Sequence, residues 1–170
     1  MNRSARIGAA VVAMLALTAA PAFAAKKVSF NTHLSGKEEV PVRETNATGQ
    51  ATFTLSSDGT ALQFRINVSN IENVVAVRME NAPLGATGPE VAILYGPVAP
   101  GGGKANGPLA TGTLAATNLV GPMAGKTITD LVAEIEAGRI YLNVLTDDGQ
   151  APSDEKPGDF SSGEIRGQIQ

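Results

Sequence analysis

Acidic side chains cluster in one short stretch of the sequence, residues 147–159. Carboxylate oxygens are ligands that Ca²⁺ favours, so the stretch is a candidate calcium site. Its spacing does not match the regular Asp-x-Asp-x-Asp-Gly frame, and Pro152 and Pro157 interrupt it. A solvated acidic loop explains the same composition. Calcium binding therefore stands as an alternative function, and its candidate ligands are Asp147, Asp148, Asp154, Glu155 and Asp159.

Residue types for thiol, imidazole or phosphate chemistry are scarce. The chain has no Cys and a single His, His33, which excludes disulfides, thiol nucleophiles and any site that needs two imidazoles. His33 has no evident acidic partner, and no Gly-x-Ser-x-Gly motif is present. The glycine run before Lys104 is not a phosphate-binding loop, because Val98 replaces its first Gly and Ala105 replaces its Ser or Thr. We therefore predict no enzyme activity, no cofactor and no transition metal.

The overall composition indicates a globular protein without a nucleic-acid partner. The 170 residues include 13 Lys and Arg against 16 Asp and Glu, and the formal net charge is −3. Binding to phosphates requires clustered Lys and Arg, and the sequence has no basic run. A hydrophobic content of 43% with 17% charged residues is typical of globular chains. The length suits one domain.

The first 24 residues have the three parts of a secretory signal peptide. Arg3 and Arg6 are followed by an uncharged apolar stretch, residues 7–20, and by the small-x-small pattern of residues 22–24. The apolar stretch is shorter than the ~20 residues that span a bilayer. We expect cleavage after Ala24, export of residues 25–170 to a periplasm or the medium, and no membrane-spanning segment in the mature protein. The partner would be a protein or an envelope component of unknown identity.

Alternating apolar and polar residues predict an all-β chain of antiparallel strands. Two such runs flank Asp58-Gly59, a pair typical of a β-hairpin turn. One segment instead has helical spacing, with Ile128, Leu131, Val132 and Ile135 on one face. Thr127 or Thr129 would cap this short helix, Gly138 would end it, and it would close one end of the core. The predicted strands are residues 28–34, 51–55, 62–68, 74–80, 90–95, 109–116, 139–146 and 164–169.

Several motifs together resemble the CHRD domain, which was first described in chordin and occurs in exported bacterial proteins. LSGKEEVPV at residues 34–42 and ATGQATF at residues 47–53 resemble its opening. GRIYLNV at residues 138–144 and GEIRGQI at residues 163–169 resemble its last two strands. The resemblance implies an antiparallel Greek-key β-sandwich, similar to immunoglobulin and superoxide dismutase domains, over residues 25–170. It implies no established general activity.

The sequence departs from the family where metal ligands would be expected. Members commonly carry His-x-His after the third strand and a further His after Asn-Val, but here these positions hold Arg78, Glu80 and Leu145. Without imidazoles or thiolates, affinity for copper or zinc should be lost. Residues two apart share one face of a strand, so Glu80 would pair with Arg166 or Arg78. We predict a structural polar network of Arg78, Glu80, Asn143 and Arg166.

These observations predict an exported, non-catalytic β-sandwich module with a binding or scaffolding role in the cell envelope or extracellular space. Loops on a rigid scaffold commonly carry recognition. The candidate binding loops are residues 85–90, 96–108 and 147–159.

Overall fold

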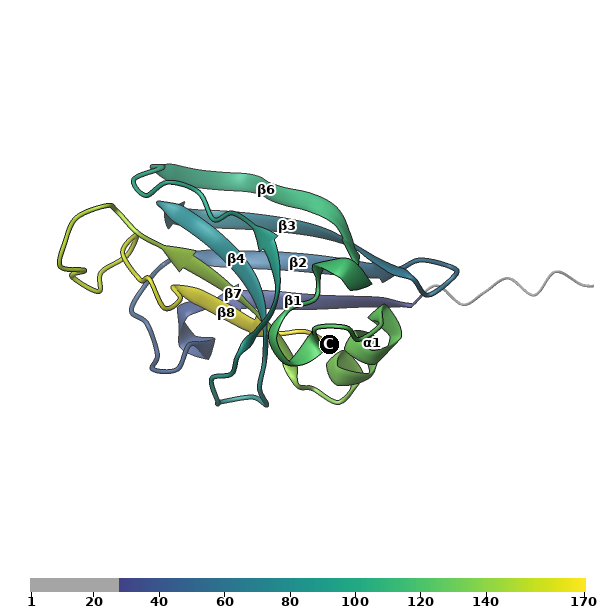
Figure 1. Ribbon diagram of the computed structural model, residues 1–170. Coiled ribbons are helices and arrows are strands. Elements are labelled where there is room, and N and C mark those ends of the chain that lie inside the picture. Colours follow the sequence, from purple (N-terminus) through teal and green to yellow (C-terminus); the bar gives the residue numbers. More distant parts are fainter. Residues whose placement is uncertain (1–27) are drawn as a thin grey trace, which may run out of the picture.

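The computed structural model describes residues 28–170. The predicted signal peptide, residues 1–24, and its cleavage site lie outside the described residues. The described part has eight antiparallel strands and one α-helix (Figure 1). The strands are β1 (Ser29–Ser35), β2 (Thr48–Leu55), β3 (Ala61–Glu72), β4 (Val74–Asn81), β5 (Glu90–Tyr95), β6 (Lys104–Ala115), β7 (Ile140–Thr146) and β8 (Ile165–Gln168).

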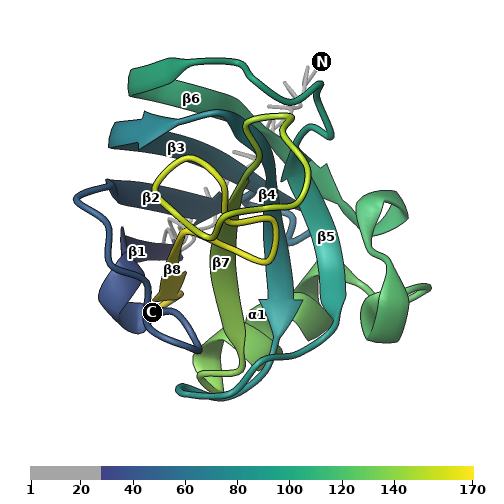
Figure 2. The same ribbon diagram turned by 90° about the vertical axis from the view of Figure 1, so that its left-hand side faces the viewer.

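The strands are hydrogen-bonded in the order β5-β4-β7-β8-β1-β2-β3-β6. The sheet curls so that β6, β3, β2 and β1 face β5, β4, β7 and β8 (Figures 1 and 2). The two halves are joined where Ser35 of β1 pairs with Arg166 of β8. Apolar side chains from both inner faces fill the space between the layers, among them Phe53, Ile66 and Val144. The prediction of an all-β antiparallel fold with one short helix is confirmed.

The hairpin between β2 and β3 forms as predicted. Its strands pair from Thr48↔Ser69 to Leu55↔Leu62. Gly59 adopts a φ of 72°, a conformation that costs glycine little. The Asp58 carboxylate accepts hydrogen bonds from Ser56 Oγ at 2.6 Å and Thr60 N at 3.1 Å, which ties the turn together. The local sequence therefore specifies this part of the fold.

The helix α1 (Ile128–Glu136) closes one end of the core, as its apolar spacing predicted. Thr127 is the cap, because its hydroxyl accepts a hydrogen bond from Asp130 N at 3.1 Å and the Asp130 carboxylate accepts one from Thr127 N at 2.8 Å. The apolar face, residues 128, 131, 132 and 135, is buried. Residues 147–164 lie at the opposite end of the molecule (Figure 1). We call this opposite end the loop end.

The composition of residues 96–108 predicts a loop, and this prediction is wrong for the last part of the segment. β6 begins at Lys104, where Lys104 pairs with Glu72 and Ala105 pairs with Ile71. Gly107 and Pro108 fit within the strand because the pairing with β3 is irregular there, with register shifts that leave Ser69 and Asn70 without a partner on β6. The composition of the segment is typical of a loop, but a β-bulge favours glycine and proline as well.

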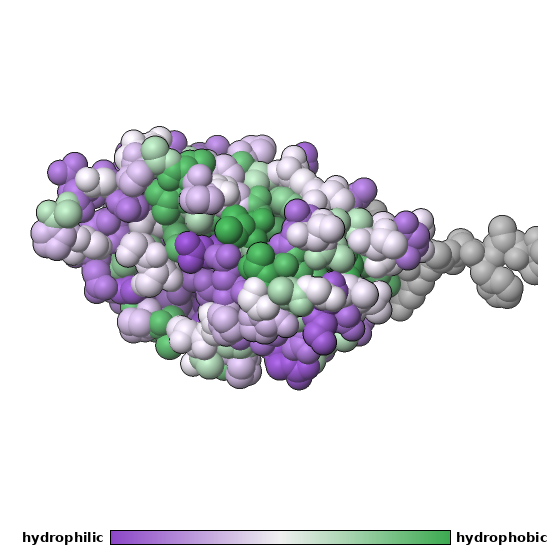
Figure 3. All heavy atoms as spheres, in the orientation of Figure 1, coloured by the Kyte–Doolittle hydropathy of each residue, from purple (hydrophilic) through white to green (hydrophobic). Residues whose placement is uncertain are grey.

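The surface seen from the direction of Figure 1 mixes polar and apolar residues. Figure 3 shows an apolar patch near the middle of this face and a mainly hydrophilic surface at the loop end. Within residues 28–170, no helix has the length and apolar character needed to cross a membrane.

Candidate functional site

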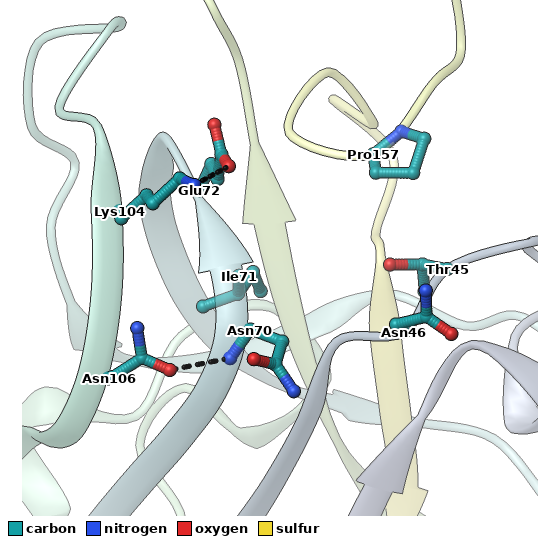
Figure 4. Close-up of a pocket in the computed structure, with 8 residues that line it drawn as sticks. All are labelled: Thr45, Asn46, Asn70, Ile71, Glu72, Lys104, Asn106 and Pro157. Carbon is teal, nitrogen blue, oxygen red and sulfur yellow. Dashed lines mark hydrogen bonds and ion pairs between the residues drawn. The ribbon is translucent and has the colours of Figure 1, made fainter.

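A polar pocket opens at the loop end, between the bulged strands and the segment that precedes β2 (Figure 4). Its volume is about 760 Å³. The end of β3, the start of β6, residues 45–46 and one proline of the acidic loop form its walls. The lining residues are Thr45, Asn46, Asn70, Ile71, Glu72, Lys104, Asn106 and Pro157. We refer to it as the carboxamide pocket, because three of these residues are asparagines.

The bulge in β3 positions two of the three carboxamides. Asn70 has a φ of 54°, a left-handed conformation that asparagine tolerates better than most residues. Its backbone N–H donates to Asn106 Oδ1 of β6 at 2.8 Å. This hydrogen bond satisfies a donor that the bulge removes from the sheet ladder. Asn70 and Asn106 are therefore held side by side at the pocket wall (Figure 4).

The charged groups of the pocket neutralise each other. Lys104 Nζ lies 3.6 Å from Glu72 Oε1, directly across the β3–β6 pair. Both side chains are largely exposed, so solvent screens the pair and it adds little to stability. The remaining lining residues carry no formal charge.

The structure brings together three of the five predicted calcium ligands. Carboxylate oxygens of Asp147, Asp148 and Asp159 lie within 4.8 Å of one another, and Asp159 is buried. Asp154 instead forms an ion pair with Lys156 at 2.5 Å, which lowers the pKa of Asp154. Glu155 forms an ion pair with Arg43 at 3.5 Å.

The predicted polar network lies on the outer face of β4, β7 and β8. Cross-strand pairing places Arg78, Asn143 and Arg166 in one row, because Asn143 pairs with Arg78 on one side and Arg166 on the other. The next row on the same face contains Glu80 opposite Tyr141. Asn143 and Arg166 are 4% and 1% exposed, since loop segments cover this face.

Within this outer-face network, the expected ion pair of Glu80 with Arg166 or Arg78 is not formed among residues 28–170. Glu80 Oε2 instead accepts a hydrogen bond from the Tyr141 hydroxyl and a long one of 3.5 Å from Asn143 Nδ2. The Arg166 guanidinium stacks on the Tyr141 ring, 3.4 Å from its centroid. Arg78 Nε lies 3.0 Å from Glu90 Oε2 on the neighbouring strand β5. Each arginine therefore has a different neighbour from the one expected.

Tyr141 acts as a hydrogen-bond donor in this network over the whole ordinary pH range. Burial, and next the hydrogen bond to Glu80, raise the pKa of Tyr141 to about 12. The phenol oxygen also accepts a hydrogen bond from Gly88 N at 3.2 Å, and so connects the loop between β4 and β5 to the network.

Sequence reasoning missed Glu39, which reaches the network from the segment between β1 and β2. Glu39 is buried, with only 7% of its surface exposed. Burial raises the pKa of Glu39 to about 7, Arg166 opposes this shift, and Glu80 adds to it. Glu39 lies in the LSGKEEVPV motif, but nothing in the local pattern distinguishes it from its exposed neighbour Glu38.

Gly163 allows the covering loop to approach the network closely. A Cβ atom at this position would lie 2.3 Å from Asn143 Oδ1 and 2.7 Å from Glu39 Oε1, closer than atoms can approach. Its neighbour Ser162 contributes a carbonyl oxygen that accepts from Asn143 Nδ2 at 3.1 Å. Asn143 Oδ1, Glu39 Oε1 and Arg166 Nη2 have no hydrogen-bond partner among the residues described.

A second missed carboxylate, Glu164, ties the loops together at the loop end. It is fully buried. One oxygen accepts from Thr45 Oγ1 at 2.7 Å, and the other accepts from Thr146 Oγ1 and from Gly158 N, both at 2.8 Å. Neutral donors thus satisfy this carboxylate. Thr45 also lines the carboxamide pocket, so the pocket wall is attached to the loop end through Glu164.

The comparison with protein families agrees with the motifs. The model of the CHRD domain matches residues 30–153, most of the described chain. This chain belongs to the CHRD family. The matched range ends before residues 163–169, so it does not include the closing part of the resemblance. Neither the curated proteins nor the solved structures gave a match.

Proposed function

We propose that this CHRD protein is an exported, non-catalytic module that binds its partner at the loop end of the sandwich. The carboxamide pocket is the observation that carries the proposal, because ligand sites are concave and use a few convergent polar groups to orient the ligand. Membership of the CHRD family supports a binding rather than a catalytic role. Export is supported by the signal-peptide pattern of residues 1–24.

Burial of the outer-face network supports a non-catalytic role. A catalytic group must touch its substrate, and loops cover the central residues of this network. Tyr141 is 1% exposed and Arg166 is also 1% exposed. His33 lies exposed on β1.

We also infer that the sandwich is a Greek key of the immunoglobulin-like and superoxide-dismutase-like kind. The edge strands β5 and β6 contact each other. Through this contact, β4, β5 and β6 lie side by side in their sequence order. β3, which precedes β4 in the chain, lies on the other side of β6. Three sequential strands with a fourth beside the far one is the Greek-key arrangement.

Affinity capture with the mature chain tests the binding role. Residues 25–170 are immobilised and exposed to an envelope extract from the source organism, next to a variant with Asn46→Ala and Asn70→Gly. A matched control carries Glu136→Ala on α1, at the opposite end. We expect partners that the loop-end variant loses and the control retains. Equal capture by all three proteins contradicts the proposed binding site. Export is tested separately: cell fractionation locates the protein, and N-terminal sequencing shows whether it is cleaved after Ala24.

The second candidate function is calcium binding at the loop end. It is favoured by the convergence of Asp147, Asp148 and Asp159, whose carboxylates provide the oxygen ligands that Ca²⁺ takes. Calorimetric titration of the mature chain with CaCl₂ should then give saturable heat that Asp148→Asn removes. Absence of heat at about millimolar calcium, the weak end of the range for extracellular sites, eliminates this function.

A further inference from the structure

We propose that the carboxamide pocket binds an uncharged, hydroxyl-rich ligand, namely a short stretch of neutral glycan. The inference rests on the proposed binding function and adds the chemical class of the ligand. It depends on the hydrogen-bonding groups that the pocket leaves free, its lack of net charge and its lack of an apolar socket.

The free hydrogen-bonding groups are the first support. Among the described residues, the side chains of Asn46 and Asn70 make no hydrogen bond, and Asn106 uses only its oxygen. A carboxamide offers two N–H donors and one acceptor oxygen. Three of them around one hollow therefore present donors and acceptors together (Figure 4). Sugar hydroxyls, which also donate and accept, match this combination.

The charge balance is the second support. Lys104 and Glu72 form an ion pair, and the other lining residues are neutral. A carboxylated, sulfated or phosphorylated ligand would have to compete with Glu72 for the single cation. A polycationic ligand would compete with Lys104 in the same way. An uncharged ligand keeps the pair intact.

The third support separates a glycan from a peptide. A bound peptide usually adds a strand to a free sheet edge and inserts side chains into apolar sockets. The β6 edge beside the pocket carries Pro108, which has no N–H, and the charged Lys104, two features that protect edges from pairing. The only large apolar residue of the pocket, Ile71, is 1% exposed and offers no socket.

The pocket is also large enough and built into the scaffold. Its volume of about 760 Å³ lies in the range of ~300–1,000 Å³ that is usual for ligand pockets. Asn70 is held in a left-handed conformation by the bulge and by Asn106. Backbone conformations of this kind cluster at ligand-binding positions, where the surrounding structure maintains them.

The experiment titrates the mature chain with neutral oligosaccharides, namely cello-, malto- and N-acetylchito-oligosaccharides. An oligogalacturonide and a sulfated oligosaccharide serve as charged comparisons. Binding is followed by calorimetry and by NMR chemical-shift changes. The test variants are Asn46→Ala and Asn70→Gly; glycine removes the carboxamide but keeps the positive φ. The matched control is Gln63→Ala, an exposed carboxamide on the same strand β3, far from the pocket.

We expect at least one neutral series to bind, with shifts at residues 45–46, 70–72 and 104–106. Each test variant should weaken binding about tenfold, the effect of losing one good hydrogen bond. The control should bind normally, and thermal melts should show that every variant folds. If only charged saccharides bind, or if a protein partner is captured at the loop end while no saccharide binds, the glycan inference is wrong and the binding module stands. If nothing binds at the loop end, both proposals fail.

Discussion

The carboxamide pocket and the outer-face network use similar residue types in opposite ways. In the pocket, Asn46 and Lys104 are exposed and form few contacts within the protein. In the network, Asn143 and Arg166 are almost completely buried, and stacking on Tyr141 fixes Arg166 in place. Burial removes water from a polar group, so its protein partners become essential for stability. The comparison teaches that covering loops, rather than residue type, separate the structural cluster from the candidate binding site.

The largest effect should come from Arg166→Ala. The substitution removes the stacked guanidinium and leaves the buried Glu39 without a nearby cation from β8. Removing one partner of a buried charge group typically costs about 3–5 kcal/mol. We expect a loss of this size in the free energy of unfolding, measured by urea denaturation. A loss below about 1 kcal/mol, as for a surface arginine, would show that the network is not a structural element.

Glu39→Gln should have the next largest effect, and that effect should depend on pH. The folded pKa of Glu39 is about 7 against an ordinary 4.5, chiefly because of burial. Between pH 4.5 and about 7, Glu39 holds a proton in the folded protein and has released it in the unfolded chain. The stability supplied by protonated Glu39 is therefore present below about pH 4.5 and is lost as the pH rises through 7. Glutamine mimics the neutral form and carries no such dependence.

The measurement for Glu39 is the difference in the free energy of unfolding between Glu39→Gln and the wild type, taken from urea denaturation across pH. The difference should be near zero at about pH 4, where the unfolded chain is also largely protonated. It should favour the variant at about pH 8, by up to about 3 kcal/mol for a shift of this size. Glu38→Gln is the matched control, because Glu38 is exposed. A flat difference across this range contradicts the role assigned to burial of Glu39.

Glu80→Ala should destabilise the protein by a smaller amount. It removes the acceptor of the Tyr141 hydroxyl and of Asn143 Nδ2. A buried donor that loses its acceptor costs roughly 1–3 kcal/mol. Differential scanning calorimetry should show a lower melting temperature, and Tyr141→Phe combined with Glu80→Ala should lose less than the sum of the two single changes. An unchanged melting temperature for Glu80→Ala would show that the hydrogen bonds around this carboxylate contribute nothing.

The smallest effect on stability should come from the carboxamide pocket. Asn46→Ala removes an exposed side chain that makes no hydrogen bond with the described residues. Surface changes of this kind usually lie within about 0.5 kcal/mol. Unfolding curves should therefore overlap those of the wild type. A loss comparable to that of Glu80→Ala would place Asn46 among the structural residues and remove the contrast between the two regions.

Much of the fold followed from local patterns in the sequence. The β2–β3 hairpin and helix α1 formed where alternation, Asp58-Gly59 and the apolar helical face predicted them. These features depend on residues that are near one another in the chain. The start of β6 was missed because glycine and proline at a bulge have the composition of a loop. The partners of Glu80 were wrong for another reason: alternation gives the face of a side chain but not which neighbour it reaches.

The sequence by itself determined the family, the strand content, the helix and the fact that Arg78 and Glu80 share one strand face, because strand periodicity and local turns decide these features. Only the tertiary structure decided that loops cover this face, that Glu39 and Gly163 meet Asn143 there, and that Asn46, Asn70 and Asn106 surround an open pocket. These residues come from segments that are distant in the chain. Their contacts, and the loss of water that raises the pKa of Glu39, arise only when the layers and loops pack together.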